Sequence, residues 1–115
     1  MPYRLTEAAD ADIRDILRQT ARRFGPLQRR RYGELIEQAA LMVAAAPERA
    51  GSRQRDELAS GIRSFHVERA GGRRGAAAHV LYYRPAQLDD GSDGIIILRV
   101  LHERMDPSRH ILRDL

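Results

Sequence analysis

Cysteine, lysine and tryptophan are all absent from this chain of 115 residues. Without cysteine, the chain has no disulfide framework, no thiolate nucleophile and no cysteine-based zinc site. Without lysine, it has no Schiff base, no P-loop lysine and no amine that could serve as a general base, because arginine keeps its proton. All 20 basic residues are arginine, which is typical of GC-rich coding, and these absences exclude several classes of enzyme.

Long hydrophobic runs are missing as well. The longest apolar run covers residues 39–46 and is 8 residues long, whereas a helix needs about 18 or more apolar residues to span a bilayer. The N-terminal sequence, which starts with Met-Pro-Tyr-Arg, lacks the hydrophobic region of a signal peptide. We therefore expect a cytoplasmic protein with no membrane contact.

The composition is that of one globular domain covering residues 1–115. Hydrophobic residues make up 43% of the chain and charged residues 31%, which is too apolar for a disordered chain. The net charge of +4 permits a polyanionic or acidic partner without identifying one.

The N-terminal half has the period of two helices. Residues 6–24 carry apolar side chains three, four and seven positions apart, from Ala9 to Phe24, which predicts one buried helix face. Gly25 is suited to end this helix, and a second stripe of the same period follows over residues 32–46. Two such helices with a tight break between them should pack as an antiparallel hairpin. Gly33, within the second helix, would let another backbone approach closely.

The C-terminal half has the period of strands. We expect a polar loop over residues 47–60 with a helical turn near Asp56–Ala59, strands at 62–69 and 76–84 around a glycine-rich turn, and a strand at 95–102. The last strand is apolar on both faces, as is typical of the centre of a sheet. A hairpin tip at 85–94 and a short edge strand at 3–5 complete the predicted elements. The predicted fold class is α+β, with the order β-α-α-β-β-β and a helical hairpin packed on a small, mainly antiparallel sheet.

Arginines are concentrated in the first helix and at the start of the second. Seven of them, against one acid, lie between residues 14 and 31. Arg14, Arg18 and Arg22 are four residues apart and share one helix face. This face is either solvated or placed to meet phosphates or the carboxylates of a partner.

A second group of arginines lies in or beside the predicted strands. A guanidinium there is costly unless it is paired or faces a cleft. Either the group pairs internally, with Glu68, Glu103 or Asp106, or it binds nucleic acid or an acidic tail. Its members are Arg63, Arg84, Arg99 and Arg104.

The four histidines are the side chains that normally titrate near neutrality. If the glycine-rich turn centres on residues 72–73, His66 and His79 face each other across the strands as a polar pair. No third ligand is placed for a metal, and the acidic run at 89–93 does not match a calcium-binding loop. We therefore expect no metal and no other cofactor.

Six segments resemble, in order and spacing, the ParE-type toxins of bacterial type II toxin–antitoxin modules. They are Tyr3–Thr6, Ile13–Ile16, Phe24–Gln28, Gly61–Val67, His79–Arg84 and Ile97–Asp106, with Arg109 and His110 closing the pattern. The resemblance implies the RelE/ParE superfamily fold, which agrees with the fold predicted from the residues. It also implies a toxin that stalls DNA gyrase and is neutralised by a ParD-like antitoxin. Operator DNA would then be bound only through the antitoxin.

Candidate contacts follow from this resemblance together with the positions of the arginines. The expected antitoxin-binding residues are Arg14, Arg18, Arg22 and Leu35. The expected target-binding residues are Arg63, Arg84, Arg99, Arg104 and Met105.

The superfamily's other branch supplies an alternative function. RelE-like toxins cut messenger RNA on the ribosome with lysines, arginines and a late tyrosine or histidine. The missing lysine disfavours that chemistry here, and the remaining catalytic candidates are His102, His110 and Arg99. We therefore expect a gyrase inhibitor without catalytic residues, with a ribosome-dependent endoribonuclease and a non-toxic basic adaptor as the alternatives.

Overall fold

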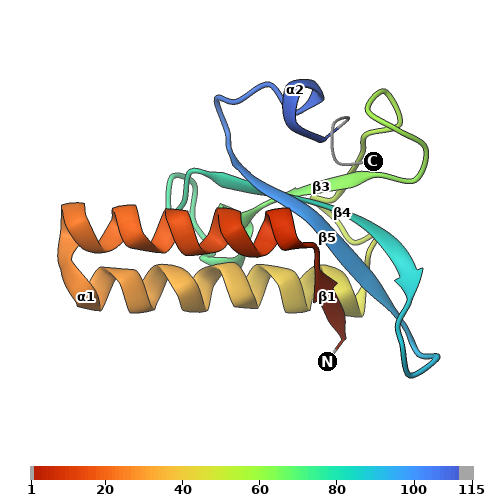
Figure 1. Ribbon diagram of the computed structural model, residues 1–115, viewed down its shortest axis with the longest axis horizontal. Coiled ribbons are helices and arrows are strands. Elements are labelled where there is room, and N and C mark those ends of the chain that lie inside the picture. Colours follow the sequence, from red (N-terminus) through yellow and green to blue (C-terminus); the bar gives the residue numbers. More distant parts are fainter. Residues whose placement is uncertain (1, 112–115) are drawn as a thin grey trace.

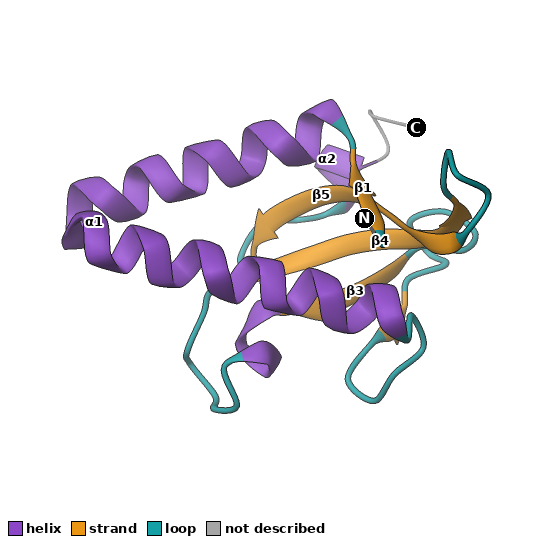
Figure 2. Ribbon diagram, turned by 90° about the horizontal axis from the view of Figure 1, so that it is seen from below, coloured by secondary structure: helices purple, strands orange, loops and turns teal. Residues whose placement is uncertain are grey.

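A computed structural model describes residues 2–111 and places a helical hairpin against one face of a five-stranded sheet (Figures 1 and 2). The predicted α+β class is confirmed. The elements are β1 (Tyr3–Leu5), α1 (Glu7–Ala45), β2 (Arg53–Gln54), β3 (Arg63–His66), a 3₁₀ helix (Val67–Ala70), β4 (His79–Gln87), β5 (Asp93–His102) and α2 (Ser108–Ile111).

The hairpin is formed by α1, which is broken at Gly25. This glycine has φ +88° and ψ 175°, and the chain reverses there before Pro26 restarts the helix. We call residues 7–24 the first arm and residues 26–45 the second arm. The two arms run antiparallel and extend past the end of the sheet (Figures 1 and 2). The predicted hairpin and its break are therefore confirmed.

Two side-chain contacts determine how the first arm begins and how the arms meet. The Thr6 hydroxyl accepts a hydrogen bond from the backbone N–H of Ala9 at 3.0 Å and donates one to the Leu98 carbonyl at 2.8 Å. It thus caps the helix and ties it to β5. The space beside Gly33 is filled by the Leu17 side chain from the other arm. The prediction of a close backbone approach at Gly33 was wrong, because the neighbouring atoms belong to the Leu17 side chain and not to a backbone.

The sheet has the strand order β1-β5-β4-β3-β2. β1 pairs parallel with β5 and the remaining pairs are antiparallel. β5 lies inside the sheet, as predicted from its apolar run, and contributes to both of its faces. Ile95 and Ile97 belong to the core beneath α1, whereas Ile96 and Leu98 belong to a second cluster on the opposite face.

Several strand boundaries differ from the predictions. The segment 47–60 is not entirely loop, because β2 pairs there with β3. The strand predicted at 62–69 ends at His66, whose imidazole accepts a hydrogen bond from the Glu68 N–H and starts the 3₁₀ helix. β4 begins three residues later than predicted and continues through Pro85, which is tolerated because β3 is too short to pair with it there.

The second apolar cluster is closed by the turn before β3 and by α2, and of these two only α2 was missing from the predicted elements. Leu58 and Ile62, from the turn that precedes β3, and Ile111 of α2 cover Tyr82 and Leu98. None of the helices formed by residues 2–111 is long and apolar enough to cross a membrane.

Candidate functional site

A groove of about 1040 Å³ lies between the first arm of α1, the loop before β4 and the C-terminal end of β5. Its mouth carries two large apolar side chains that solvent reaches, Phe24 at 67% exposed and Met105 at 47%. The exposure of Phe24 corrects its predicted place on the buried face of the first helix. The hairpin that carries Phe24 at its bend projects beyond the end of the sheet (Figure 1).

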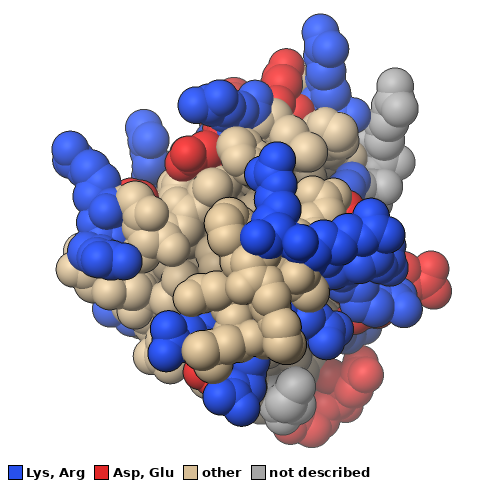
Figure 3. All heavy atoms as spheres, turned by 90° about the vertical axis from the view of Figure 1, so that its left-hand side faces the viewer, with Lys and Arg blue, Asp and Glu red and all other residues tan. Residues whose placement is uncertain are grey.

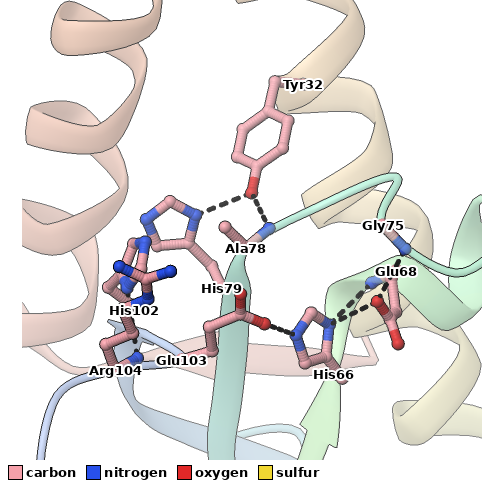
Figure 4. Close-up of polar contacts among 9 residues, drawn as sticks. All are labelled: Tyr32, His66, Glu68, Gly75, Ala78, His79, His102, Glu103 and Arg104. Carbon is pink, nitrogen blue, oxygen red and sulfur yellow. Dashed lines mark hydrogen bonds and ion pairs between the residues drawn. The ribbon is translucent and has the colours of Figure 1, made fainter.

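A hydrogen-bonded tyrosine and histidine line this groove. The Tyr32 hydroxyl oxygen lies 2.6 Å from Nδ1 of His79 and also accepts a hydrogen bond from the Ala78 N–H at 3.1 Å (Figure 4). Burial raises the pKa of Tyr32 above its ordinary value, so the hydroxyl is protonated at neutral pH and donates a hydrogen bond to Nδ1. Burial, followed by the neighbouring imidazoles of His102 and His66, lowers the pKa of His79 to about 4. His79 is therefore neutral at physiological pH, with its proton on Nε2.

The predicted pairing of His66 with His79 was wrong by one residue. His66 lies opposite Val80, and His79 lies opposite His102 with the two ring centres 5.4 Å apart. A shift of one residue moves a side chain to the other face of a sheet. Nε2 of His66 instead donates a 2.7 Å hydrogen bond to Glu103, which lowers the pKa of that carboxyl (Figure 4).

Arg99 is held in the groove by Asp12 of the first arm. Its Nε and one terminal nitrogen donate to the two carboxylate oxygens at 2.7 and 2.8 Å, and the Val100 N–H donates to the same carboxylate at 3.0 Å. The side chains are 17% and 15% exposed. The prediction of internal pairing is confirmed for this arginine, but the partner is Asp12 and not Glu68, Glu103 or Asp106.

The other predicted target-binding residues do not form one surface with Arg99. Arg63 is turned inward, where its Nε donates to the Ser52 hydroxyl at 2.8 Å and the Pro47 carbonyl at 3.0 Å. Arg84 and Arg104 are exposed, and neither lines the groove. Of this set, Arg99 and Met105 are brought together by the groove.

The predicted antitoxin-binding residues lie outside the groove lining. Arg14, Arg18 and Arg22 are exposed on the first arm, and two of them form ion pairs within that arm. Arg14 meets Asp10 at 2.9 Å and Arg18 meets Asp15 at 3.5 Å. Leu35 is half-buried and packs against the core, so it supports the fold of the hairpin.

The residues named for the alternative, catalytic function all line the groove. Arg99, His102 and His110 come together from β5 and α2. Asp12, Phe24, Tyr32 and His79 were not among the predicted site residues. Among residues 2–111, no three histidine or carboxylate side chains are placed to hold a metal ion.

The low pKa of His79 predicts a specific dependence of stability on pH. In the unfolded chain this histidine gains its proton near pH 6.5, whereas in the folded chain it does so near pH 4. Stability is therefore complete above pH 6.5 and falls as the pH drops toward 4, by about 1 to 2 kcal/mol after allowance for partial solvent screening.

Urea unfolding of the wild type and His79→Gln, at neutral pH and near pH 4.5, measures this effect. The glutamine variant does not titrate at this position and should lose less stability than the wild type over the interval. Parallel losses in the two proteins would contradict the assignment.

Comparison with known proteins identifies the family to which this groove and hairpin belong. Residues 3–107 match the family model for the ParE toxin of the type II toxin–antitoxin system parDE. The chain is 33% identical over 111 residues to Toxin ParE1 of Caulobacter vibrioides, covering 96% of this chain and 97% of the relative. It is 34% identical over 109 residues to Toxin ParE1 of Mycobacterium tuberculosis, covering 95% and 96%, and 31% identical over 104 residues to Toxin ParE of Escherichia coli, covering 90% and 86%. The chain therefore belongs to the ParE toxin family of type II toxin–antitoxin systems.

Proposed function

We propose that this toxin acts in the cytoplasm by inhibiting DNA gyrase, without catalysing a reaction itself. The state of two ionisable groups in the groove supports this proposal. Arg99 is engaged by Asp12, and the pKa of His79 is about 4. A general base that works at neutral pH is most effective with a pKa near 7. Arg99 and His79 are therefore better suited to binding than to proton transfer.

We also propose a ParD-like antitoxin as the partner that neutralises the toxin. Phe24 and Met105 offer two apolar anchor points at the mouth of the groove. Arg14, Arg18 and Arg22 lie on the same arm as Phe24 and would steer an acidic segment toward it. Operator DNA would be bound through the antitoxin. A small acidic protein encoded beside this toxin would be the first candidate.

One observation favours a second candidate, a ribosome-dependent endoribonuclease. Arg99, His102 and His110 line the same groove, and a cation with two imidazoles is a plausible set for cleaving RNA. In this alternative, Arg99 would bind the scissile phosphate while still held by Asp12.

Two assays on the purified toxin distinguish these functions. The first incubates it with gyrase and supercoiled plasmid and measures double-strand cleavage, and the second incubates it with translating ribosomes and measures message length. We expect gyrase-dependent DNA cleavage, intact message and full activity of His110→Ala. Message cleavage that is lost in His110→Ala, with supercoiling unaffected, would establish the endoribonuclease in place of the gyrase inhibitor.

A further inference from the structure

The tip of the helical hairpin combines exposed apolar side chains with a dense group of arginines. Phe24 and Leu27, on either side of the break at Gly25, are 67% and 47% exposed. Figure 3 looks onto this end of the molecule and shows arginine side chains projecting around an uncharged surface. We define the hairpin tip as Phe24 and Leu27 with the five exposed arginines that flank them, Arg22, Arg23, Arg29, Arg30 and Arg31.

The arginines of this tip lie in an acid-free stretch of the sequence. Residues 16–33 contain no aspartate or glutamate. Among residues 2–111, no carboxylate lies within ion-pair distance of any of the five arginines. The other two arginines of the first arm differ in this respect, since Arg14 and Arg18 both have acidic partners. The tip is therefore a concentrated positive charge that faces solvent.

The stability of the fold does not explain the arginines of the second arm. Arg22 and Arg23 end the first arm, where cations interact favourably with the helix dipole. Arg29, however, lies just after the N-terminus of the second arm, where a cation gains nothing from the dipole. Three adjacent arginines also repel one another. Such a group indicates an anionic partner.

The directions of these side chains favour a nucleic-acid duplex over an acidic peptide. Successive helical residues project about 100° apart, so Arg29, Arg30 and Arg31 point in three directions around a convex tip. An acidic peptide lying along one side would meet few of them. A groove in duplex DNA has a row of phosphates on each side, with one charge per about 1.7 Å of helix axis. A convex tip placed over it would meet both rows.

The apolar apex fits the same partner. Proteins that bind the minor groove often combine arginines with a phenylalanine, leucine or proline that contacts the base steps. Phe24, Pro26 and Leu27 occupy the apex between the two sets of arginines. Phe24 also lines the groove described above, so the two surfaces meet at this side chain.

We propose that the hairpin tip binds duplex DNA through its phosphates, without sequence specificity. The role of this contact rests on the proposed function, because gyrase holds the duplex that the tip would touch. The contact differs from operator recognition, which needs base-specific readout by the antitoxin. The proposed contact involves only the toxin and the duplex, so it can be measured in the absence of gyrase.

Fluorescence anisotropy of a labelled mixed-sequence duplex of about 20 base pairs, titrated with purified toxin between about 50 and 200 mM salt, tests the proposal. The tip variant is Arg29→Gln, Arg30→Gln, Arg31→Gln. The matched control is Arg53→Gln, Arg73→Gln, Arg74→Gln, which removes the same charge from exposed positions elsewhere. Circular dichroism verifies that both variants are folded.

We expect the tip variant to bind the duplex about tenfold or more weakly than the wild type. The slope of log K against log salt should become shallower by about 2 to 3. The control should change the affinity by less than about threefold. Equal losses of affinity in both variants would overturn the proposal. Stronger binding of the toxin to polyglutamate or to anionic vesicles than to the duplex would overturn it as well. Duplex binding by a toxin that does not affect gyrase would overturn the proposed function alone. Gyrase inhibition by a toxin that does not bind the duplex would overturn this inference alone.

Discussion

Replacing Asp12 with alanine should lower the free energy of unfolding by about 3 kcal/mol, the lower end of the cost of breaking a buried ion pair. The substitution takes the Asp12 carboxylate away from the guanidinium of Arg99, a side chain that is 17% exposed, and it also removes the acceptor of the Val100 N–H. A largely buried guanidinium that loses a bidentate carboxylate keeps its desolvation cost and loses much of the attraction that offset it. Urea unfolding at neutral pH measures the difference.

Asp10→Ala is the matched control for this prediction. Asp10 lies in the same arm and also forms an ion pair, at 2.9 Å with Arg14, but both side chains are at least half exposed. An exposed pair of this kind contributes about 0 to 1 kcal/mol. If Asp12→Ala and Asp10→Ala lower the free energy of unfolding equally, the ion pair of Asp12 with Arg99 contributes no more to stability than an exposed pair.

A second substitution separates the loss of the pair from damage to the helix. In Asp12→Ala with Arg99→Met, both charges are removed and a side chain of similar length remains. Replacing a buried ion pair by apolar groups is often close to neutral, so the double variant should be more stable than Asp12→Ala alone. A double variant less stable than the single one would contradict this account.

The parts of the fold that depend on local signals could be predicted from the sequence. The helical hairpin follows from a period of 3.6 and from Gly25, whose positive φ is a property of that one position. The interior place of β5 follows from an uninterrupted apolar run. Both signals lie within a few residues of the feature that they predict.

The site depended on contacts that no local pattern contains. Asp12 and Arg99 are 87 residues apart in the chain and meet because the first arm lies beside β5. The partner of His79 depended on a register that was predicted with an error of one residue. Phe24 has the spacing of a buried residue, yet it is exposed, since it lies at the break at Gly25, and the hairpin extends past the end of the sheet (Figure 1).

Truncating the two apolar side chains at the mouth of the groove should weaken antitoxin binding strongly. In Phe24→Ala with Met105→Ala, we expect the dissociation constant to rise at least about 30-fold, corresponding to about 2 kcal/mol. Large side chains that are exposed in the free protein and covered in the complex contribute most of the affinity at such interfaces. Titration calorimetry with the cognate antitoxin measures the effect.

Leu41→Ala is the control, because Leu41 is also an exposed apolar residue of α1, at 38%, but does not line the groove. It should leave the dissociation constant within about threefold of the wild type. Reversing the charges of Arg14, Arg18 and Arg22 to glutamate should instead slow association and reduce its dependence on salt. The two sets of variants thus separate anchoring from steering. If the groove variant binds as tightly as Leu41→Ala while the arginine variant does not bind, the antitoxin is held by the charged face of the first arm and not by the groove.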